Sequence, residues 1–282
     1  MSAATGLRVE RDRVLWLILG IVLLGGLVGS ALFAPEYLSR PDLEARSLGP
    51  FTSPPLGTDT RGRPLVEYAL QGAKIVALPA ALAGLLVMVL ATLAGLARSV
   101  GMTWVDNGLQ LFQELVGAVP RLVVILVVAI AMPPDYRSLL PLGLAWAFLA
   151  APGAMDEAAA TAGRLGGERF VEALRAHGFT APRIYLYHIV WLNLRSVIVR
   201  QGAEVTMQVV FLEIALSYLA MVEQQPAFTH ADSSNSWARL LYEGYTWLVG
   251  HVPMGHAMVL GLVLVALVAL MAQAFRLAAR PR

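Results

Sequence analysis

Apolar runs of about 20 residues recur along this chain, and they constrain its fold more than any other feature of the sequence. A run of that length crosses roughly 30 Å of hydrocarbon as a helix. Only 14% of the 282 residues are charged, and they cluster between the runs, whereas 57% are hydrophobic. Inside lipid only helices and closed barrels satisfy every backbone group, and the runs lack the alternation of barrel strands. The sequence therefore predicts an all-α, polytopic membrane protein.

The hydropathy pattern predicts six transmembrane helices. They are expected at residues 14–34, 75–97, 108–132, 139–151, 196–222 and 252–275. Pro120 is expected to kink the third span, and the fourth is expected to stop at Pro152–Gly153. Arginines precede the first span and follow the last, and positive charge beside a span tends to stay in the cytoplasm. Both termini are therefore expected to be cytoplasmic.

The chain divides into four expected parts. Residues 1–13 are a cytoplasmic segment, 14–34 the first span, 35–74 an extracytoplasmic segment, and 75–282 a five-helix core that carries a cytoplasmic loop at 152–193. In the extracytoplasmic segment, LGTDTRGRP at 56–64 has turn chemistry, and its Thr58 or Asp59 is a candidate helix cap. Residues 64–74 predict a short amphipathic helix at the membrane interface. A second polar loop should contain a helix from Ser236 to about Gly244.

Four charged residues fall inside the expected spans and are candidates for lining a pathway: Glu114, Arg121, Glu204 and Glu213. A charge in lipid is expensive and normally faces protein or a water-filled cavity. Glu114 and Arg121 are seven residues apart, so a structural ion pair on one helix face explains them equally well. Hydrogen bonding between helices is the preferred explanation for Glu204, and both explanations stay open for Glu213.

Residues 151–193 form the longest charged segment between apolar runs. A helical pattern covers residues 168–177, Gly178 interrupts it, and a second helical pattern begins after Pro182. A short helix of this kind between two spans predicts a docking surface on one face of the membrane. An ordinary amphipathic surface helix would show the same pattern.

Several chemistries are excluded by what the sequence lacks. It has no Cys, which excludes disulfides, thiolate metal sites and a cysteine nucleophile. It has no GxxxxGK[ST] motif for nucleotide phosphates, no HExxH and no GxSxG, and its five His show no metal-binding spacing. The net charge of +2 is too small to indicate nucleic acid. The chain is therefore expected to be non-catalytic, with no metal or cofactor of its own.

Two stretches resemble a known family: LGTDTRGRPLVEYALQGAK at 56–74 and FVEALRAHGFTAPRIYLYHI at 170–189. They are similar to inner-membrane permease subunits of the ABC transporters for dipeptides, oligopeptides and nickel, of the type with one outer segment after the first span. WVD at 104–106 and LEIALSYL at 212–219 also resemble that family. The family's LGTDxxGRD pattern, GAR-like triplet and cytoplasmic EAA loop are matched at Leu56, Gly57, Thr58, Asp59, Gly62, Arg63, Gly72, Ala73, Glu172, Ala173 and Gly178.

The chain also departs from the family pattern. Pro64 follows the Gly-Arg pair where the family has Asp, and Trp191 replaces a proline. Acidic residues stand at 156 and 157, near a position that is usually basic in the family. These departures concern the substrate and the fit to partners.

The resemblance implies a MetI-like type I ABC importer permease in the bacterial inner (plasma) membrane. Such a subunit forms half of a translocation pathway for peptides or peptide-like solutes. It pairs with a second permease subunit as a heterodimer, with two ATPase subunits that bind ATP and Mg, and with an extracytoplasmic substrate-binding protein. Coupling to the ATPase would fall to Phe170, Glu172, Ala173, His177 and Gly178.

The alternative is an ion-coupled secondary transporter that uses Glu114, Glu204 or Glu213 as carriers. Such folds usually contain inverted repeats and more spans, and the sequence shows neither. The cargo stays open between dipeptide, oligopeptide, nickel chelate and peptide antibiotic.

Overall fold

The structure is a computed structural model that describes residues 3–52, 54–133, 136, 138–166, 169–223, 235–250 and 255–279. Within these ranges it contains helices and no strand. The elements are α1 (Ala3–Leu32), α2 (Leu65–Val100), α3 (Thr103–Gly117), α4 (Arg121–Ala131), α5 (Leu139–Gly166), α6 (Arg169–Ala176), η2 (Arg183–Leu194), α7 (Arg195–Glu223), α8 (Trp237–Val249) and α9 (Gly255–Ala278).

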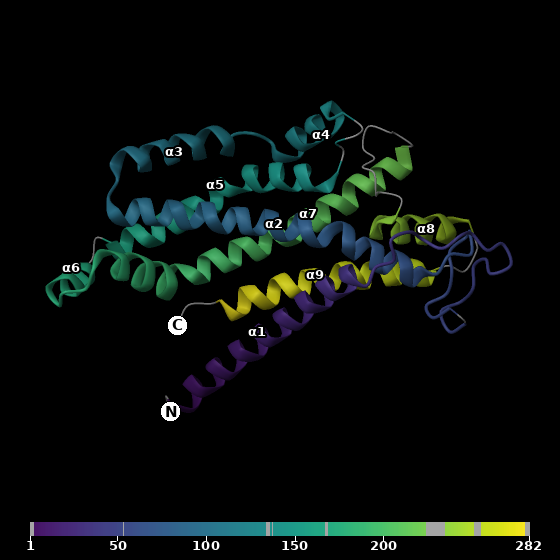
Figure 1. The fold of residues 1–282 in the computed structure, drawn as a ribbon, viewed down its shortest axis with the longest axis horizontal. Coiled ribbons are helices and arrows are strands. Elements are labelled where there is room, and N and C mark those ends of the chain that lie inside the picture. Colours follow the sequence, from purple (N-terminus) through teal and green to yellow (C-terminus); the bar gives the residue numbers. More distant parts are fainter. Residues whose placement is uncertain are drawn as a thin grey trace.

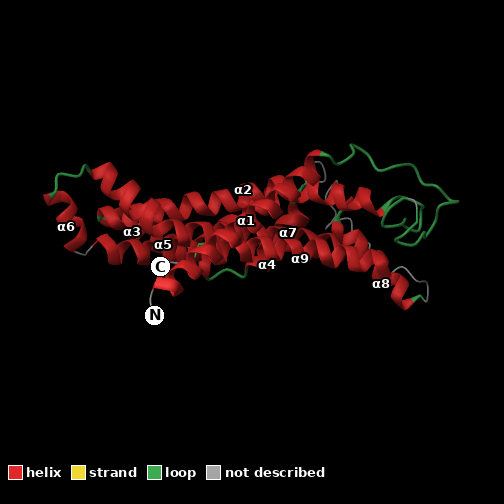
Figure 2. Ribbon diagram, turned by 90° about the horizontal axis from the view of Figure 1, so that it is seen from below, coloured by secondary structure: helices red, strands yellow, loops and turns green. Residues whose placement is uncertain are grey.

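The long helices run side by side along one axis (Figure 1). In the described residues five helical stretches are long and apolar enough to cross a membrane, and α3 with α4 makes a sixth if that bent pair is one span. The protein is thus an all-helical, multi-pass membrane protein. Helix α6 lies at one end of the bundle, which we call the α6 end, and α8 lies at the other, the α8 end. Helix α1 starts and α9 finishes at the α6 end, and Figure 2 shows the loop segment before α2 at the α8 end.

Helix α2 is the central element of the bundle, and it packs mainly on α5 and α7. Its buried positions are mostly Ala, Gly and Val, which let neighbouring backbones approach closely. A Cβ added to Gly84 would lie 2.3 Å from Thr206 Oγ1 and 2.8 Å from the carbonyl oxygen of Gly202. Helices α2 and α7 therefore cross in direct contact at Gly84, near the middle of the apolar run at 75–97.

The interfacial helix expected at residues 64–74 is instead the start of α2. Leu65, Tyr68 and Gln71 are buried under the preceding segment and against α8. The buried positions continue at three- and four-residue steps past Lys74, which is exposed, so nothing interrupts the helix there. Packing on α8 and the outer segment replaces the contact with the membrane surface that the sequence suggested.

The fourth span does not stop at Pro152–Gly153, because α5 continues to Gly166. A proline inside a membrane helix is tolerated when neighbouring elements satisfy the freed backbone group, and here α2 and α7 flank α5. As a result Asp156 and Glu157 stand on the bundle helix, within what was expected to be a cytoplasmic loop.

The third expected span is broken between α3 and α4, which are bent by 77° to each other. The break lies at residues 118–120, so the predicted effect of Pro120 is confirmed, as a larger bend than an ordinary kink. Glu114 and Arg121 stand on separate arms of this bend. The explanation that paired Glu114 with Arg121 on one helix face is therefore wrong. Among the ion pairs of the described residues, none joins these two side chains.

The segment before α2 is held by the LGTDTRGRP turn. Asp59 is fully buried, and its carboxylate accepts hydrogen bonds from the Arg61 and Arg63 amides and from the Tyr68 hydroxyl. It therefore closes its own turn and does not cap α2, whose first turn has no side-chain cap. Gly62 has a φ of +77°, and a Cβ there would lie 1.7 Å from the carbonyl oxygen of Asp42. This turn is tightly packed, and glycine is sterically required at position 62.

Candidate functional site

Helix α6 is a short helix that stands at the end of the bundle (Figure 1). Val171 is buried, and Leu174 packs against the main core. Glu172 and Ala173 are exposed on the opposite side, together with His177 just after the helix. Phe170 and Gly178 complete the five predicted coupling residues. The side chain of Phe170 lies outside the described part of the chain. The described coupling residues therefore share an exposed, unpartnered surface.

Gly178 ends α6 in a Schellman motif. Its φ is +78°, its amide donates to the Arg175 carbonyl oxygen over 2.9 Å, and the Phe179 amide donates to the Leu174 carbonyl oxygen over 3.1 Å. Leu174 and Phe179 also pack against the same core cluster, which is the apolar contact that accompanies this motif. The glycine break predicted from the sequence is thus a defined chain reversal.

The segment after Gly178 ties α6 to the spans. Arg175 donates a hydrogen bond to the Tyr185 hydroxyl over 2.7 Å, and the Arg183 guanidinium lies 4.8 Å from the centroid of the Phe179 ring. Helix η2 then continues without a break into α7. The α6 segment is therefore linked to α7 through η2.

A half-buried polar stripe runs along α7 at its contact with α5. Gln201, Glu204 and Gln208 are three or four positions apart, so they share a helix face, and all three are half-buried. Gln208 donates to Glu204 over 3.3 Å and accepts from the indole nitrogen of Trp146 on α5 over 3.0 Å. Glu204 therefore belongs to an interhelical hydrogen-bond network.

A second α5–α7 contact lies closer to the α6 end. Arg200 forms an ion pair with Glu157, whose other carboxylate oxygen accepts from Gln201 over 2.6 Å. The two charged side chains are 29% and 37% exposed, so this pair is open to its surroundings in the isolated chain. Two polar contacts thus join the same two helices along one face.

The four candidates for lining a pathway do not come together. Glu213 is fully buried, nine residues after Glu204 on α7, and accepts a hydrogen bond from Ser217 over 2.7 Å. Glu114 is exposed on α3, and Arg121 starts α4 beyond the bend. Only Glu204 belongs to the polar stripe.

Sequence reasoning missed most of this network. The sequence places Glu157 in a loop, because Pro152–Gly153 predicts the end of a span. The signal that could have found the stripe is the polar spacing at 201–208, where Gln201, Glu204 and Gln208 recur at three- and four-residue steps directly after Arg200.

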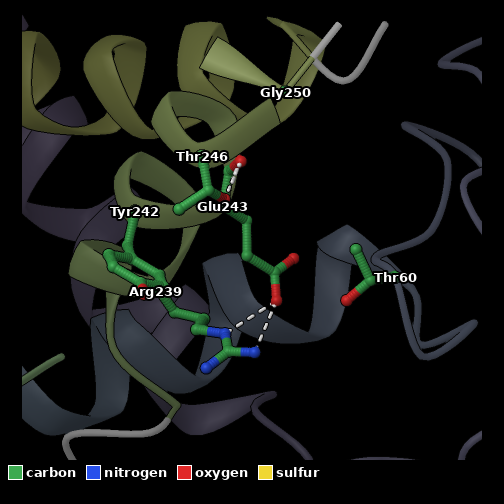
Figure 3. A pocket seen from close by; sticks show the side chains of 6 residues that line it. All are labelled: Thr60, Arg239, Tyr242, Glu243, Thr246 and Gly250. Carbon is green, nitrogen blue, oxygen red and sulfur yellow. Dashed lines mark hydrogen bonds and ion pairs between the residues drawn. The ribbon is translucent and has the colours of Figure 1, made fainter. Parts of the chain in front are cut away.

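At the α8 end a cavity of about 300 Å³ lies between the LGTDTRGRP turn and α8 (Figure 3). Glu243 lies at its centre, 3% exposed, and one of its carboxylate oxygens accepts from two nitrogens of Arg239 at 2.7 Å. Burial raises the pKa of Glu243 above its ordinary value, and the negative charge of Asp59 adds to this, while Arg239 opposes it. The cavity therefore surrounds an ion pair within α8 that faces the turn. Its lining residues are Thr60, Arg239, Tyr242, Glu243, Thr246 and Gly250.

Among the described residues, no group of three or more His, Asp or Glu side chains is placed to hold a metal ion. A scan against models of known protein families and a search of curated proteins both give no match. Function must therefore be argued from the exposed α6 surface and the polar stripe.

Proposed function

We propose that this chain is the membrane-spanning permease subunit of an ATP-driven importer for peptides or peptide-like solutes. The observation that carries the proposal is the geometry of α6: a short amphipathic helix, exposed at one end of a helical bundle, closed by Gly178 and joined through η2 to a span with a polar face. The link from α6 through η2 to α7 supports a docking role over that of an ordinary surface helix.

The exposed side of α6 fits a groove on an ATPase subunit. Glu172 is free to pair with a basic group there, and Ala173 permits close approach of the two backbones. ATP binding would draw the two ATPase subunits together, and with them the docked helices. Because α6 is tied to η2 and α7, this movement would tilt the spans between inward- and outward-open states.

The polar stripe supports a partner in the membrane. A half-exposed ion pair and the side chains of Gln201, Glu204 and Gln208 would be costly against lipid. A second permease subunit would cover this face, and a wet pathway between the two subunits would solvate the stripe. The cargo would arrive from an extracytoplasmic binding protein at the α8 end.

The distribution of arginines supports a cytoplasmic α6 end. At the α8 end the segment before α2 carries four arginines, Arg40, Arg46, Arg61 and Arg63, fewer than lie around α6. The described arginines at the α6 end are Arg11, Arg13, Arg98, Arg164, Arg175, Arg183, Arg195 and Arg276.

The test uses the complete transporter, with its ATPase subunits and binding protein, in proteoliposomes. Gly178→Val strains the chain reversal by about 1–2 kcal/mol or more, and Glu172→Arg reverses the exposed charge. Each variant should lower the amount of solute transported per ATP hydrolysed about tenfold. That is within the range by which mutations along a coupling network change the coupling free energy. Insertion and helix content should be unchanged.

Matched controls exist in the same chain. Gly101 ends α2 with a φ of +76° and open space around it, so Gly101→Val carries the same backbone strain at the end of another helix. Glu44→Arg reverses an exposed charge at the α8 end. Transport at the wild-type rate in both α6 variants, or equal losses in the controls, would refute the docking role.

The second candidate is an ion-coupled secondary transporter, favoured by one observation. Glu204 is half-buried at the level of the centre of the apolar run of α2, where a carboxylate could carry a proton. Transport by the chain alone, driven by a proton gradient and abolished by Glu204→Gln, would favour this candidate. Transport that requires ATP and co-purified ATPase subunits would exclude it.

A further inference from the structure

Helix η2 is wound as a π-helix, and its buried face follows that winding. Ile184, Ile189 and Leu194 are 1% exposed or less, at steps of five residues. A π-helix bonds residue i to residue i+5 and is wider than an α-helix, so residues five apart lie on the same side of it. The burial pattern therefore agrees with the winding and assigns the other face of η2 to the surroundings.

That other face is apolar, aromatic and basic, and we call it the basic–aromatic stripe. Trp191 is 60% exposed, Leu186 55% and Tyr187 49%. Its members are Arg183, Leu186, Tyr187, Trp191, Leu192 and Arg195. Large apolar side chains this exposed mark a contact surface.

The stripe lies in a stretch of the sequence that carries only positive charge, and of its arginines Arg200 is paired with Glu157 of α5. Residues 173–203 contain four arginines and no aspartate or glutamate. The nearest acidic residue before this stretch is Glu172, and the nearest after it is Glu204. The surface that covers the stripe should therefore be negatively charged.

The depth of η2 in the bundle indicates what that surface is. A Cβ added to Gly95 of α2 would lie 3.0 Å from the side chain of Leu194. Gly95 precedes Arg98, where the apolar run of α2 ends, by three residues. The span that contains η2 and α7 is 39 residues long, whereas about 20 suffice to cross the hydrocarbon. The C-terminal end of η2 thus lies at the edge of the hydrocarbon, and the rest of η2 lies at the level of the headgroups.

We propose that the basic–aromatic stripe binds the headgroups of anionic phospholipids. Trp191 and Tyr187 sit in the headgroup layer, as amphipathic rings do. Leu186 and Leu192 dip into the acyl boundary, and Arg183 and Arg195 contact lipid phosphates. This inference requires a bilayer but does not depend on the transport function proposed above.

Lipid selectivity tests the charge of the stripe. The purified full chain is placed in nanodiscs of phosphatidylcholine mixed with phosphatidylglycerol, and native mass spectrometry counts the lipids that it retains. Phosphatidylglycerol should be preferred, and Arg183→Gln and Arg195→Gln should each lower its affinity about fivefold. Arg46→Gln, at an exposed position of the α8 end, is the matched control and should change nothing.

Depth-dependent quenching tests the position of the stripe without removing a charge. Phospholipids brominated near the headgroup or near the chain end are compared, and the signal of Trp191 is the difference between the wild type and Trp191→Phe. Quenching should be stronger from the shallow position. Equal retention of both lipids, unchanged affinity in the arginine variants, or a Trp191 shielded from both brominated lipids by a protein partner would overturn the proposal.

Discussion

At the scale of the residue, several side chains that look functional in the sequence are held by packing. Asp59 closes its own turn, and Gly57 and Gly62 stand where any Cβ would strike backbone atoms. The LGTDTRGRP pattern is therefore explained by steric and hydrogen-bonding needs of the fold. A resemblance based on this pattern reports shared architecture more directly than a shared substrate.

Gly72 makes the steric argument testable. A Cβ at Gly72 would lie 2.2 Å from the indole of Trp237, which donates a hydrogen bond to the carbonyl oxygen of Ala69 over 2.9 Å. Gly72→Ala should destabilise the protein by about 1–3 kcal/mol through overpacking, measured as a lower thermal midpoint in detergent. Gly108→Ala, at a helical glycine with open space, is the control and should be neutral or slightly stabilising. Equal midpoints for the two variants would contradict the close contact.

Glu243 gives a prediction about pH. Burial raises its pKa in the folded protein above the ordinary 4.5, so the folded state holds more protons than the unfolded state between these two values. The contribution of Glu243 to stability is therefore present below pH 4.5 and is lost as the pH rises through the folded pKa. The thermal midpoint of the wild type, relative to Glu243→Gln, should fall over that window. A difference that stays constant or rises with pH would contradict the assigned direction.

At the scale of the element, the sequence predicts helix identity better than helix ends. The start of α8 is confirmed, because Ser236 is its N-cap and accepts from the Ala238 amide over 3.1 Å. The helix boundaries expected at Lys74 and at Pro152 are wrong. Contacts with α8, α2 and α7 determine where these helices begin and end, and the local sequence does not reveal those contacts. The π-helical winding of η2 could not be predicted from the sequence either, although burial at every fifth residue agrees with it.

The bend at Pro120 can be measured directly, because the chain has no native Cys to compete with introduced labels. Spin labels at Trp104→Cys and Val127→Cys, both exposed positions, report the distance across the bend. A straight helix would separate them by about 35 Å. The wild type should be clearly shorter, and Pro120→Ala should lengthen the distance. An unchanged distance in Pro120→Ala would show that packing on α5, and not the proline, imposes the bend.

At the scale of the whole molecule, the apolar runs were sufficient to predict a multi-pass helical bundle. The candidate site was predicted only in part. The exposure of Glu172 and Ala173 follows from the amphipathic pattern of one short helix. The contact between Glu157 and Arg200 depends on which faces of two distant helices meet, and a single sequence does not encode that in any local pattern.

The arrangement of the two ends predicts a labelling pattern. Ala176 on α6 and Arg46 before α2 are exposed at opposite ends of the bundle. In intact cells a membrane-impermeant thiol reagent should modify Arg46→Cys and spare Ala176→Cys until the membrane is opened. Modification of both variants from outside would place the two ends on the same side and would contradict the topology.

The LGTDTRGRP turn before α2 also has a practical consequence. Phe51 is fully exposed, at 101%, on a segment whose base is fastened by the Gly57 and Gly62 contacts. An epitope inserted beside Phe51 would stand on a segment that the packed Gly57 and Gly62 hold in place. An antibody fragment bound there would give a small, nearly featureless membrane protein a fiducial mark for single-particle imaging.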